Sequence, residues 1–378
     1  MIHRVAILHW RDILNPESGG AENLLFRIAQ QLTFQGFQVT WFSPRVRGSQ
    51  LLKNIDGVVF HGVGTKYNAY LLTPLLYLIR WRKCFDLFVD SITGVPWFTP
   101  LYIRRARIAA IYHLGKKETF LKDFRYRRGV FGYFLGVLAL IAESSIPFLY
   151  RNTDMITFSE DTRNELLRIG LNPGRIFVAQ EGIELKRYVP NFSKPAQPTV
   201  VYVGRLVATK GIEHLLQAIK IVEQRIPSVR LILVGRGYLE RQLKELCELL
   251  DIRCNVEFAG YVAEEQKIAI LRDAQVLVMP SLREGWATPV LEANACGTPA
   301  VGTDVPGVRN TIIDDVTGFV VPYGDPESLA DRILHILMDQ EKAKRMAQAA
   351  YKLVKQYDIE KTIAVSLEVF KRNLYRLK

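Results

Sequence analysis

Two acidic and two basic residues in the second half of the chain have types and spacing suited to a phosphate and sugar site. Glu284 and Glu292 lie on either side of a turn that leads from a short apolar segment into a helical one. Arg205 and Lys210 follow another apolar segment. Carboxylates accept hydrogen bonds from sugar hydroxyls, and basic side chains neutralise phosphate oxygens. These four residues predict a pocket for a nucleoside diphosphate joined to a group rich in hydroxyls.

The helix start beside Glu292 is expected to add backbone donors to this pocket. Thr288 is a suitable N-cap, and Pro289 suits the first helical position because its missing N–H costs nothing there. The N–H groups of Val290 and Leu291 are then expected to point toward a bound anion. The sequence therefore predicts an anion site at this helix start.

Glycine-containing turns supply further candidate donor-binding positions. Gly19 and Gly20 open the first helical segment, where the missing β-carbon lets backbone N–H groups approach a phosphate. An ordinary strand-to-helix turn is the alternative. Gly204 and Gly235 follow two predicted strands of the second half. None of these turns has the third glycine of a dinucleotide fingerprint, so nicotinamide chemistry is poorly supported.

Strand and helix patterns alternate through both halves of the chain. This alternation predicts two parallel sheets with helices on both faces, and ligands outside the carboxyl ends of the strands. The proline-rich stretch 190–198 is the predicted linker, which gives domains 1–190 and 191–358. The expected strands are 4–9, 38–42, 87–89, 107–112, 155–158 and 176–179, then 200–203, 230–234, 256–258, 276–279, 299–301 and 318–321.

The composition indicates an ordinary globular chain with an anionic partner. Its 378 residues are more than one typical domain, and 49% are hydrophobic and 23% charged. The net charge of +12 favours nucleic acid, an acidic membrane face or anionic substrates as partners. The start of the chain has no signal-peptide pattern, and the apolar stretch 130–142 is too short to span a bilayer. We therefore expect a cytoplasmic protein, either soluble or peripheral on the inner face of the cell membrane.

A basic and aromatic segment between residues 101 and 129 is a candidate membrane surface. Aromatic residues are interleaved with basic ones there, and an apolar stretch follows, which favours contact with anionic lipid. No motif supports a nucleic-acid patch. A solvated basic face over a buried helix is the remaining alternative. The residues assigned to membrane or acceptor contact are Arg104, Arg105, Lys116, Lys117, Arg125, Arg127 and Arg128.

One further side chain is a candidate catalytic group, and no metal motif is present. His113 follows a predicted strand and could contact the transferred group or the acceptor, although a packing or surface histidine is the alternative. No Asp-x-Asp pair, no metal-ligand spacing of His, Cys and carboxylates, and no P-loop motif occurs. The four cysteines lie far apart, as expected for reduced core residues. We therefore expect no metal and no cofactor.

The chain resembles the retaining glycosyltransferases of the GT-B fold that are called group 1 or family 4. The matching motifs extend over nearly the whole chain and are most specific in its second half. They are Gly19-Gly20-Ala21-Glu22, Phe158-Ser159-Glu160, Gly204-Arg205, Lys210-Gly211, Val234-Gly235-Arg236-Gly237, Phe258-Ala259-Gly260, Pro280-Ser281, Glu284, Glu292, Gly297-Thr298-Pro299, Thr317-Gly318 and Val321-Pro322.

This resemblance implies two Rossmann-like domains that face each other across a cleft. The first domain would bind mostly the acceptor, the second mostly a nucleotide sugar, and a final helix from about residue 359 would pack back onto the first. Glu292 would hold the ribose, and Arg205 and Lys210 the diphosphate. Glu284 would contact the donor sugar.

Other positions receive roles from the same resemblance. Gly20 would close over the phosphates, and His113 would lie near the sugar. Tyr261, Val262 and Glu264 would read the base, largely through their backbone. Glu181-Gly182-Ile183-Glu184 departs from the usual Asn-Gly-Ile/Val-Asp, and Ala287-Thr288-Pro289 departs from the usual Gly-Leu/Met-Pro. The first departure affects a hinge-side contact, and the second leaves the preferred donor sugar open.

The resulting hypothesis is glycosyl transfer with retention, from a nucleotide sugar to a hydroxyl of a lipid-linked or glycan acceptor at the cytoplasmic membrane face. The resemblance implies a front-face route, in which a donor phosphate oxygen takes the proton of the acceptor hydroxyl. Two alternatives stay open. One is a sugar-nucleotide epimerase of the same fold class, and the other is a non-catalytic protein that binds sugar nucleotides or lipid.

Overall fold

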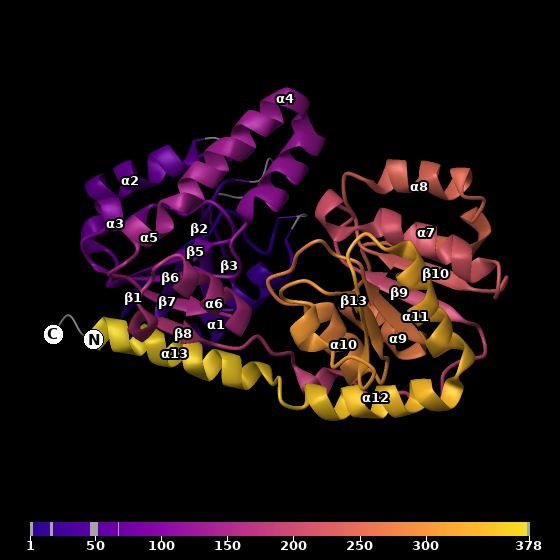
Figure 1. The fold of residues 1–378 in the computed structure, drawn as a ribbon. Coiled ribbons are helices and arrows are strands. Elements are labelled where there is room, and N and C mark those ends of the chain that lie inside the picture. Colours follow the sequence, from indigo (N-terminus) through magenta and orange to yellow (C-terminus); the bar gives the residue numbers. More distant parts are fainter. Residues whose placement is uncertain (1–2, 16–17, 46–51, 67, 376–378) are drawn as a thin grey trace. The chain divides into compact units, whose positions relative to one another are not determined.

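The computed structural model describes residues 3–15, 18–45, 52–66 and 68–375, without the side chains of residue 118 and residues 122–128 (Figure 1). The chain divides into two compact units. The first comprises residues 1–120, 135–180 and 360–378, and the second comprises residues 121–134 and 181–359. Apart from residues 121–134, the chain passes into the second unit after Gln180, earlier than the boundary predicted after residue 190.

The first unit is built on a sheet with the strand order β3-β4-β2-β1-β5-β6-β7-β8. Neighbouring strands are parallel except for β3 and β4, which form an antiparallel hairpin that the sequence analysis missed. Asp56 and Gly57 connect them with positive φ angles, as in a type I′ turn. The strands are β1 (Arg4–Leu8), β2 (Gln38–Ser43), β3 (Leu52–Ile55), β4 (Val58–Gly62), β5 (Leu87–Ile92), β6 (Ala106–Ile111), β7 (Asp154–Thr157) and β8 (Ile176–Val178).

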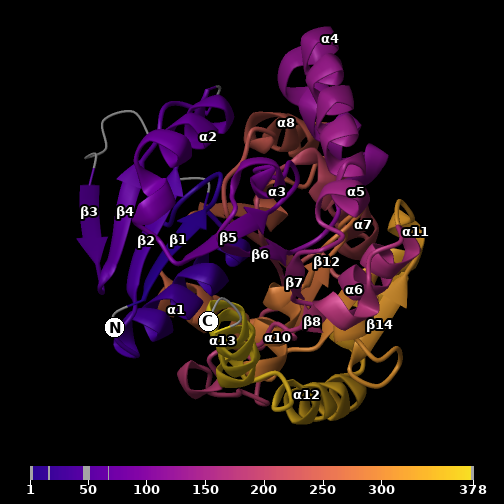
Figure 2. The same cartoon turned by 90° about the vertical axis from the view of Figure 1, so that its left-hand side faces the viewer.

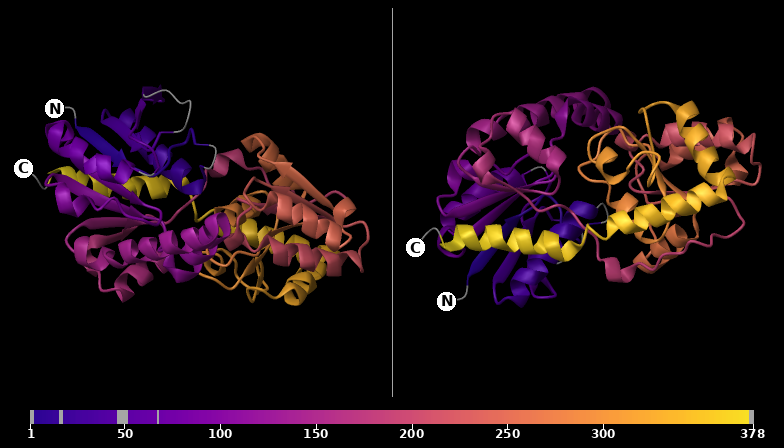
Figure 3. Two further views of the ribbon diagram at one scale, coloured as in Figure 1. Left: turned by 90° about the horizontal axis from the view of Figure 1, so that it is seen from above. Right: turned by 60° about the horizontal axis from the view of Figure 1, so that its bottom comes forward.

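Helices cover both faces of this first sheet. α2, α3 and α5 lie over one face, and α1 and α13 lie over the other (Figures 1 and 2). Figure 3 shows α13, in yellow, beside the strands of the first unit, where Asn373 donates to Asp154 of β7 at 3.2 Å. The helices are α1 (Gly20–Phe34), α2 (Ala69–Ile79), α3 (Thr99–Tyr102), α4 (Lys116–Ser144), α5 (Ile146–Leu149), α6 (Glu160–Arg168) and α13 (Ile359–Tyr375).

Helix α4 reverses direction at Gly129, whose φ of +58° lies in the left-handed region. A straight helix of 29 residues would be ~43 Å long. The backbone N–H of Lys116 nevertheless donates to the Glu143 carboxylate at 2.9 Å, so the two arms fold back on each other.

The apolar segment around α4 is longer than the predicted stretch 130–142. Gly129–Leu149 has 21 residues and a mean hydropathy of 1.7, enough to cross a bilayer by length and composition alone. The prediction that this stretch is too short was therefore wrong. A core helix would meet the same criterion, so the segment alone does not establish a membrane span.

The second unit is built on a fully parallel sheet with the strand order β11-β10-β9-β12-β13-β14. All six strands predicted for this half are present, so the predicted fold class of two α/β domains with parallel sheets is confirmed. The strands are β9 (Thr199–Val203), β10 (Arg230–Val234), β11 (Val256–Gly260), β12 (Val276–Met279), β13 (Ala300–Thr303) and β14 (Gly318–Val321).

Two apolar layers cover the faces of the second sheet. One layer is packed with buried side chains of α7, α8 and α11, and the other with side chains of α9 and α10. The helices of this unit are α7 (Ile212–Glu223), α8 (Glu240–Leu249), α9 (Glu264–Asp273), α10 (Thr288–Ala295), α11 (Pro326–Met338) and α12 (Gln340–Val354).

The centre of the second sheet lies between β9 and β12. From β9 the chain continues to β10 and β11 on one side, whereas β12 leads to β13 and β14 on the other side. The connections therefore diverge at this point, which is where open parallel sheets bind their ligands.

Candidate active site

Lys210 and Glu284 meet at the point where the connections after β9 and β12 diverge. The Nζ of Lys210 forms an ion pair with Oε1 of Glu284, and the Ser281 hydroxyl donates to the same oxygen at 2.6 Å. Their side chains are only 16% and 11% exposed. The structure thus brings together a basic and an acidic residue that are 74 positions apart in the sequence.

Backbone contacts hold the loops around this ion pair. The Leu282 N–H donates to the Thr209 carbonyl at 2.9 Å, and the Ala287 N–H donates to the Gly307 carbonyl at 2.8 Å. Gly307 has a φ of +81°, and a β-carbon there would lie 2.5 Å from the Glu284 carbonyl oxygen. Only glycine fits this position, so the loop after β13 fixes the loop that carries Glu284.

Gly211 and Gly235 permit similarly close backbone packing. A β-carbon on Gly211, with a φ of +61°, would lie 2.2 Å from the Pro280 carbonyl oxygen. A β-carbon on Gly235 would lie 1.9 Å from the carbonyl oxygen of Gly204. The predicted donor-binding glycines Gly204 and Gly235 therefore have a packing role at the ends of β9 and β10.

Arg205 lies on the same connection as Lys210 but outside the ion pair. Its side chain is exposed, and within the described part of the chain its guanidinium forms no ion pair. The Arg205 carbonyl accepts a hydrogen bond from the Tyr202 hydroxyl at 2.9 Å, which fixes the backbone. The guanidinium is therefore available to an anion from solution.

The start of α10 differs from the prediction. Ala287 is the N-cap, and the Thr288 hydroxyl donates to the Glu181 carboxylate at 2.6 Å instead of capping the helix. The N–H of Val290 donates to the Ala287 carbonyl at 2.8 Å. The predicted roles of Thr288 as N-cap and of Val290 as a free backbone donor were therefore wrong, because the Thr288 hydroxyl and the Val290 N–H already have partners within the protein. Leu291 lies in the same turn and is fully buried.

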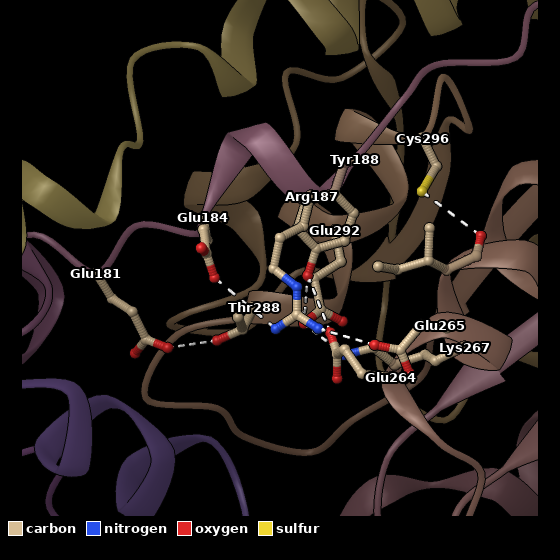
Figure 4. Close-up of polar contacts among 11 residues, drawn as sticks. Glu181, Glu184, Arg187, Tyr188, Glu264, Glu265, Lys267, Thr288, Glu292 and Cys296 are labelled. Atoms are coloured by element: carbon tan, nitrogen blue, oxygen red, sulfur yellow. Dashed lines mark hydrogen bonds and ion pairs between the residues drawn. The ribbon is translucent and has the colours of Figure 1, made fainter. Parts of the chain in front are cut away.

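Glu292 of α10 is neutralised by a lysine from the neighbouring helix α9. The Nζ of Lys267 lies 2.7 Å from the Glu292 carboxylate and 3.0 Å from the Glu264 carboxylate. The Tyr188 hydroxyl adds a hydrogen bond of 3.3 Å to Glu292 (Figure 4). Burial raises the pKa of Glu292, and the Lys267 ammonium opposes that rise. Burial lowers the pKa of Lys267, but the two carboxylates outweigh it and raise that pKa overall.

Glu181 adds a third carboxyl group beside α10. Figure 4 shows it pointing at Thr288, on the opposite side of the cluster from Lys267. Burial, together with the smaller effect of the charges of Glu292 and Glu284, raises the pKa of Glu181 to about 7, although the hydrogen bond from Thr288 acts against this rise. Glu181 is therefore close to half protonated at neutral pH.

The predicted base-reading segment follows β11. Tyr261 is 75% exposed, Val262 is half-buried, and Glu264 begins α9. The Glu264 carboxylate contacts Lys267 and Tyr188. Its side chain therefore helps to hold the Glu292 cluster.

The first-unit candidates lie at the carboxyl ends of their own strands. The N–H of Gly19 donates to the Glu22 carboxylate at 2.8 Å, so this donor is already used. Arg11 contacts the other Glu22 oxygen at 3.1 Å and fixes the turn that leads into Gly20. His113 follows β6 and is half-buried. The roles predicted for Gly20 and His113 stay predictions.

The residues assigned to membrane contact fall into three groups. Arg104, Arg105 and Lys117 are exposed. Lys116 is partly exposed, and its ammonium pairs with the buried Glu165 at 2.6 Å while its N–H donates to Glu143, so its role at a membrane stays a prediction. The side chains of Arg125, Arg127 and Arg128 lie outside the described residues. Among the described residues, no three His, Cys, Asp or Glu side chains are grouped as metal ligands would be.

Comparison with known proteins identifies the family. A family profile described as "Glycosyl transferases group 1" matches residues 189–353, and one described as "Glycosyltransferase Family 4" matches residues 18–187. The chain belongs to the group 1 glycosyltransferases of the GT-B fold. Among its relatives is the "Phosphatidylinositol N-acetylglucosaminyltransferase gpi3 subunit" of Schizosaccharomyces pombe, 24% identical over 91% of this chain and 75% of that protein. Another is the "Capsular polysaccharide biosynthesis glycosyltransferase CapM" of Staphylococcus aureus, 25% identical over 76% of this chain and 78% of that protein.

Solved structures share the fold of this glycosyltransferase. Sucrose-phosphate synthase from Thermosynechococcus elongatus superposes with a TM-score of 0.81 at 21% identity, over the whole of both chains. An Anabaena protein, HepE, solved in complex with UDP-glucose, superposes with a TM-score of 0.75 at 18% identity, over 97% of this chain and 99% of that one.

The sequence analysis missed two residues of the candidate site and gave a third no role in it. Lys267 and Tyr188 both contact Glu292, and Glu181 appeared only as a departure from the family motif. The spacing of Glu264 and Lys267 on one helix face could have indicated Lys267 as an ion-pair partner. No local signal connects Tyr188 with Glu292, which is 104 positions away.

We expect Lys267→Ala to destabilise the second unit because it leaves the Glu292 carboxylate buried without its cation. The free energy of unfolding at pH 8, measured by urea denaturation, is expected to fall by roughly 2–4 kcal/mol. The double variant Lys267→Ala/Glu292→Gln should recover much of this loss, since a neutral amide needs no counter-charge. If the double variant lost as much free energy of unfolding as Lys267→Ala and Glu292→Gln lose together, the pairing would be contradicted.

We expect Glu181 to make stability depend on pH. Its folded pKa of about 7 lies above the ordinary value of 4.5. Between these values the folded protein holds a proton that the unfolded chain releases, so stability falls as pH rises from 4.5 to about 7 and then levels off.

The variant Glu181→Gln should lose this component, worth on the order of 3 kcal/mol. Urea denaturation at pH 5 and pH 8 measures it. The control Glu248→Gln, at an exposed position on α8, should keep the wild-type pH profile. An unchanged profile in Glu181→Gln would show that this carboxyl titrates normally.

Proposed function

We propose that this protein is a retaining, metal-independent glycosyltransferase that moves a sugar from a nucleoside diphosphate sugar to a hydroxyl of a lipid-linked or glycan acceptor. We place it at the cytoplasmic face of a membrane. The observation that carries the proposal is the pair of lysine–glutamate contacts, Lys210–Glu284 and Lys267–Glu292, on neighbouring loops and helices of the second unit.

The two lysines allow carboxylates to stand beside a diphosphate. Lys210 balances Glu284, so Glu284 can accept hydrogen bonds from sugar hydroxyls without repelling the phosphates as a bare charge would. Lys267 does the same for Glu292, which would accept the hydroxyls of the ribose. Arg205, exposed and without an ion pair among the described residues, would add its guanidinium to the departing diphosphate.

The state of Glu284 supports a front-face route for the proposed retention over a route with a covalent intermediate. One of its oxygens already accepts a hydrogen bond from Ser281 and the charge of Lys210, which makes it a weak nucleophile. The acceptor hydroxyl would therefore attack from the face that the diphosphate leaves, and a phosphate oxygen of the donor would take its proton. Basic side chains supply the charge stabilisation in this scheme.

Relatives support the proposed donor and acceptor classes. Two of them, from Arabidopsis thaliana and Schizosaccharomyces pombe, are named as parts of a phosphatidylinositol N-acetylglucosaminyltransferase, which supports a lipid acceptor. The Staphylococcus aureus relative is named for capsular polysaccharide biosynthesis, which supports a glycan acceptor. The structure of HepE with UDP-glucose supports a nucleotide-sugar donor.

We expect Lys210→Ala and Glu292→Ala each to lower kcat about 100-fold, as for a lost electrostatic contact in an active site. Release of nucleoside diphosphate is measured with a panel of nucleotide sugars and lipid or glycan acceptors, in the presence of EDTA. The matched control is Lys244→Ala, which removes an exposed lysine–glutamate contact on α8 of the same unit and should leave kcat unchanged.

The same assay separates the alternatives. Donor incubated alone would yield an isomerised sugar nucleotide if the protein were an epimerase. Donor binding without any release of nucleoside diphosphate would indicate a non-catalytic binding protein. Wild-type rates in both variants would contradict the site assignment, and inactivation by EDTA would contradict metal independence.

A further inference from the structure

Helix α2 of the first unit exposes a continuous apolar face. Leu71, Leu75, Leu78 and Ile79 are 79%, 51%, 60% and 74% exposed. Their spacing of four, seven and eight positions from the first residue places them on one side of the helix. Tyr77, on the other side, is fully buried against the body of the unit. A soluble helix would normally present polar residues on its outer side, so this face calls for a partner.

Helix α3 extends the same surface. The backbone N–H of Arg104, just after α3, donates to the Tyr77 hydroxyl at 3.1 Å. The rings of Tyr77 and Tyr102 pack edge to face, with centroids 5.7 Å apart. Leu101 of α3 is 67% exposed. We refer to Leu71, Leu75, Leu78, Ile79 and Leu101 together as the α2–α3 apolar surface.

Basic residues without acidic neighbours in the sequence surround this surface. No Asp or Glu occurs in residues 57–85 or in residues 91–117. Five exposed basic side chains follow the two helices, and none of them forms an ion pair within the described part of the chain. They are Arg80, Arg82, Lys83, Arg104 and Arg105.

The opposite helix layer of the same sheet lacks such a face. Its exposed large apolar residues in α1 and α13 are Phe34 and Tyr375, each at the last position of its helix. Figures 1 and 2 show these two helices on the other side of the sheet from α2 and α3. The exposed large apolar residues of these two helix layers are therefore gathered on the side of α2 and α3.

We propose that the α2–α3 apolar surface docks this protein onto an anionic phospholipid bilayer. The leucine and isoleucine side chains enter the boundary of the acyl chains, and the five surrounding basic residues bind lipid phosphates. Helix α2 has only 11 residues, ~16 Å, so it lies in the plane of the interface instead of crossing the bilayer.

This inference rests on the proposed function, because an enzyme that acts on a lipid-linked acceptor must reach it at a bilayer surface. It also revises the membrane segment predicted at residues 101–129. Among the basic residues proposed to bind lipid phosphates, Arg104 and Arg105 are retained and Lys116 is no longer included. Arg80, Arg82 and Lys83 are added.

Flotation of the full chain with vesicles tests the proposal without any donor or acceptor. Wild-type protein should float with vesicles of phosphatidylcholine and phosphatidylglycerol in a 7:3 ratio, and much less with pure phosphatidylcholine or in 0.5 M NaCl. Leu75→Glu/Leu78→Glu should weaken binding tenfold or more. Arg104→Gln/Arg105→Gln should weaken binding to the anionic vesicles only.

The matched control is Phe34→Glu, which changes an even more exposed apolar residue on α1 and should bind like wild type. A second comparison is Ile141→Glu, on the apolar arm of α4, where the side chain is 62% exposed. Far-UV circular dichroism and a thermal melt establish that each variant is folded.

Three results would overturn the proposal. The first is that wild-type protein does not bind anionic vesicles. The second is that Leu75→Glu/Leu78→Glu binds vesicles as well as wild type does. The third is that only Ile141→Glu loses binding. A fourth contradicting result would be a dimer held together by this surface, which size-exclusion chromatography with light scattering would detect. Thermal stabilisation of the same variants by a nucleoside diphosphate reports separately on the proposed donor site, so the two failures are distinguishable.

Discussion

The ion pair between Lys210 and Glu284 is the constraint on which the rest of the site depends. A carboxylate can stay charged near a diphosphate only when a cation lies against it, and the low exposure of both side chains makes their attraction stronger than it would be in water. The sheet meets this requirement through its topology, because β9 and β12 are neighbours and the loops that follow them meet. Glycine at positions 211 and 307 permits the close backbone contacts that hold these loops in place.

A second lysine–glutamate ion pair stabilises the charge of Glu292 in the same way. Burial alone would favour the protonated form of this carboxyl group, and the Lys267 ammonium counteracts that effect. Glu181, which has a threonine hydroxyl as its partner and no lysine, shows the alternative outcome, a pKa raised to about 7. The two carboxylates proposed to bind sugar hydroxyls are thus the ones that have a lysine, and this distinguishes them from the third.

The strands of the second unit could be predicted from sequence because most are short apolar runs with a glycine or proline at or near their end. The hairpin of β3 and β4 was missed although Asp56-Gly57 is a strong turn signal, because the polar sequence of Leu52–Ile55 does not alternate as a half-buried strand does. The reversal of α4 at Gly129 was also missed. Helical periodicity continues through a single glycine, and the turn is revealed by the left-handed φ of Gly129 and by the contact between Lys116 and Glu143.

For the site, the sequence indicated which residues carry charge but not how they are paired. Glu284, Glu292 and Lys210 could be selected by residue type and by motif. Their partners depend on packing between distant segments, as with Lys267 on α9. The start of α10 illustrates a further limit. Local rules assign the Thr288 hydroxyl to capping and the Val290 N–H to an anion. In the structure the hydroxyl donates to Glu181 and the N–H donates to the Ala287 carbonyl.

Hydrogen exchange with and without a nucleoside diphosphate tests the central claim most directly. The account predicts slower amide exchange in two segments together, residues 204–211 and residues 284–292, because the ligand would bind where the connections after β9 and β12 diverge. Protection of only one of these segments, or protection confined to other parts of the second unit, would contradict it.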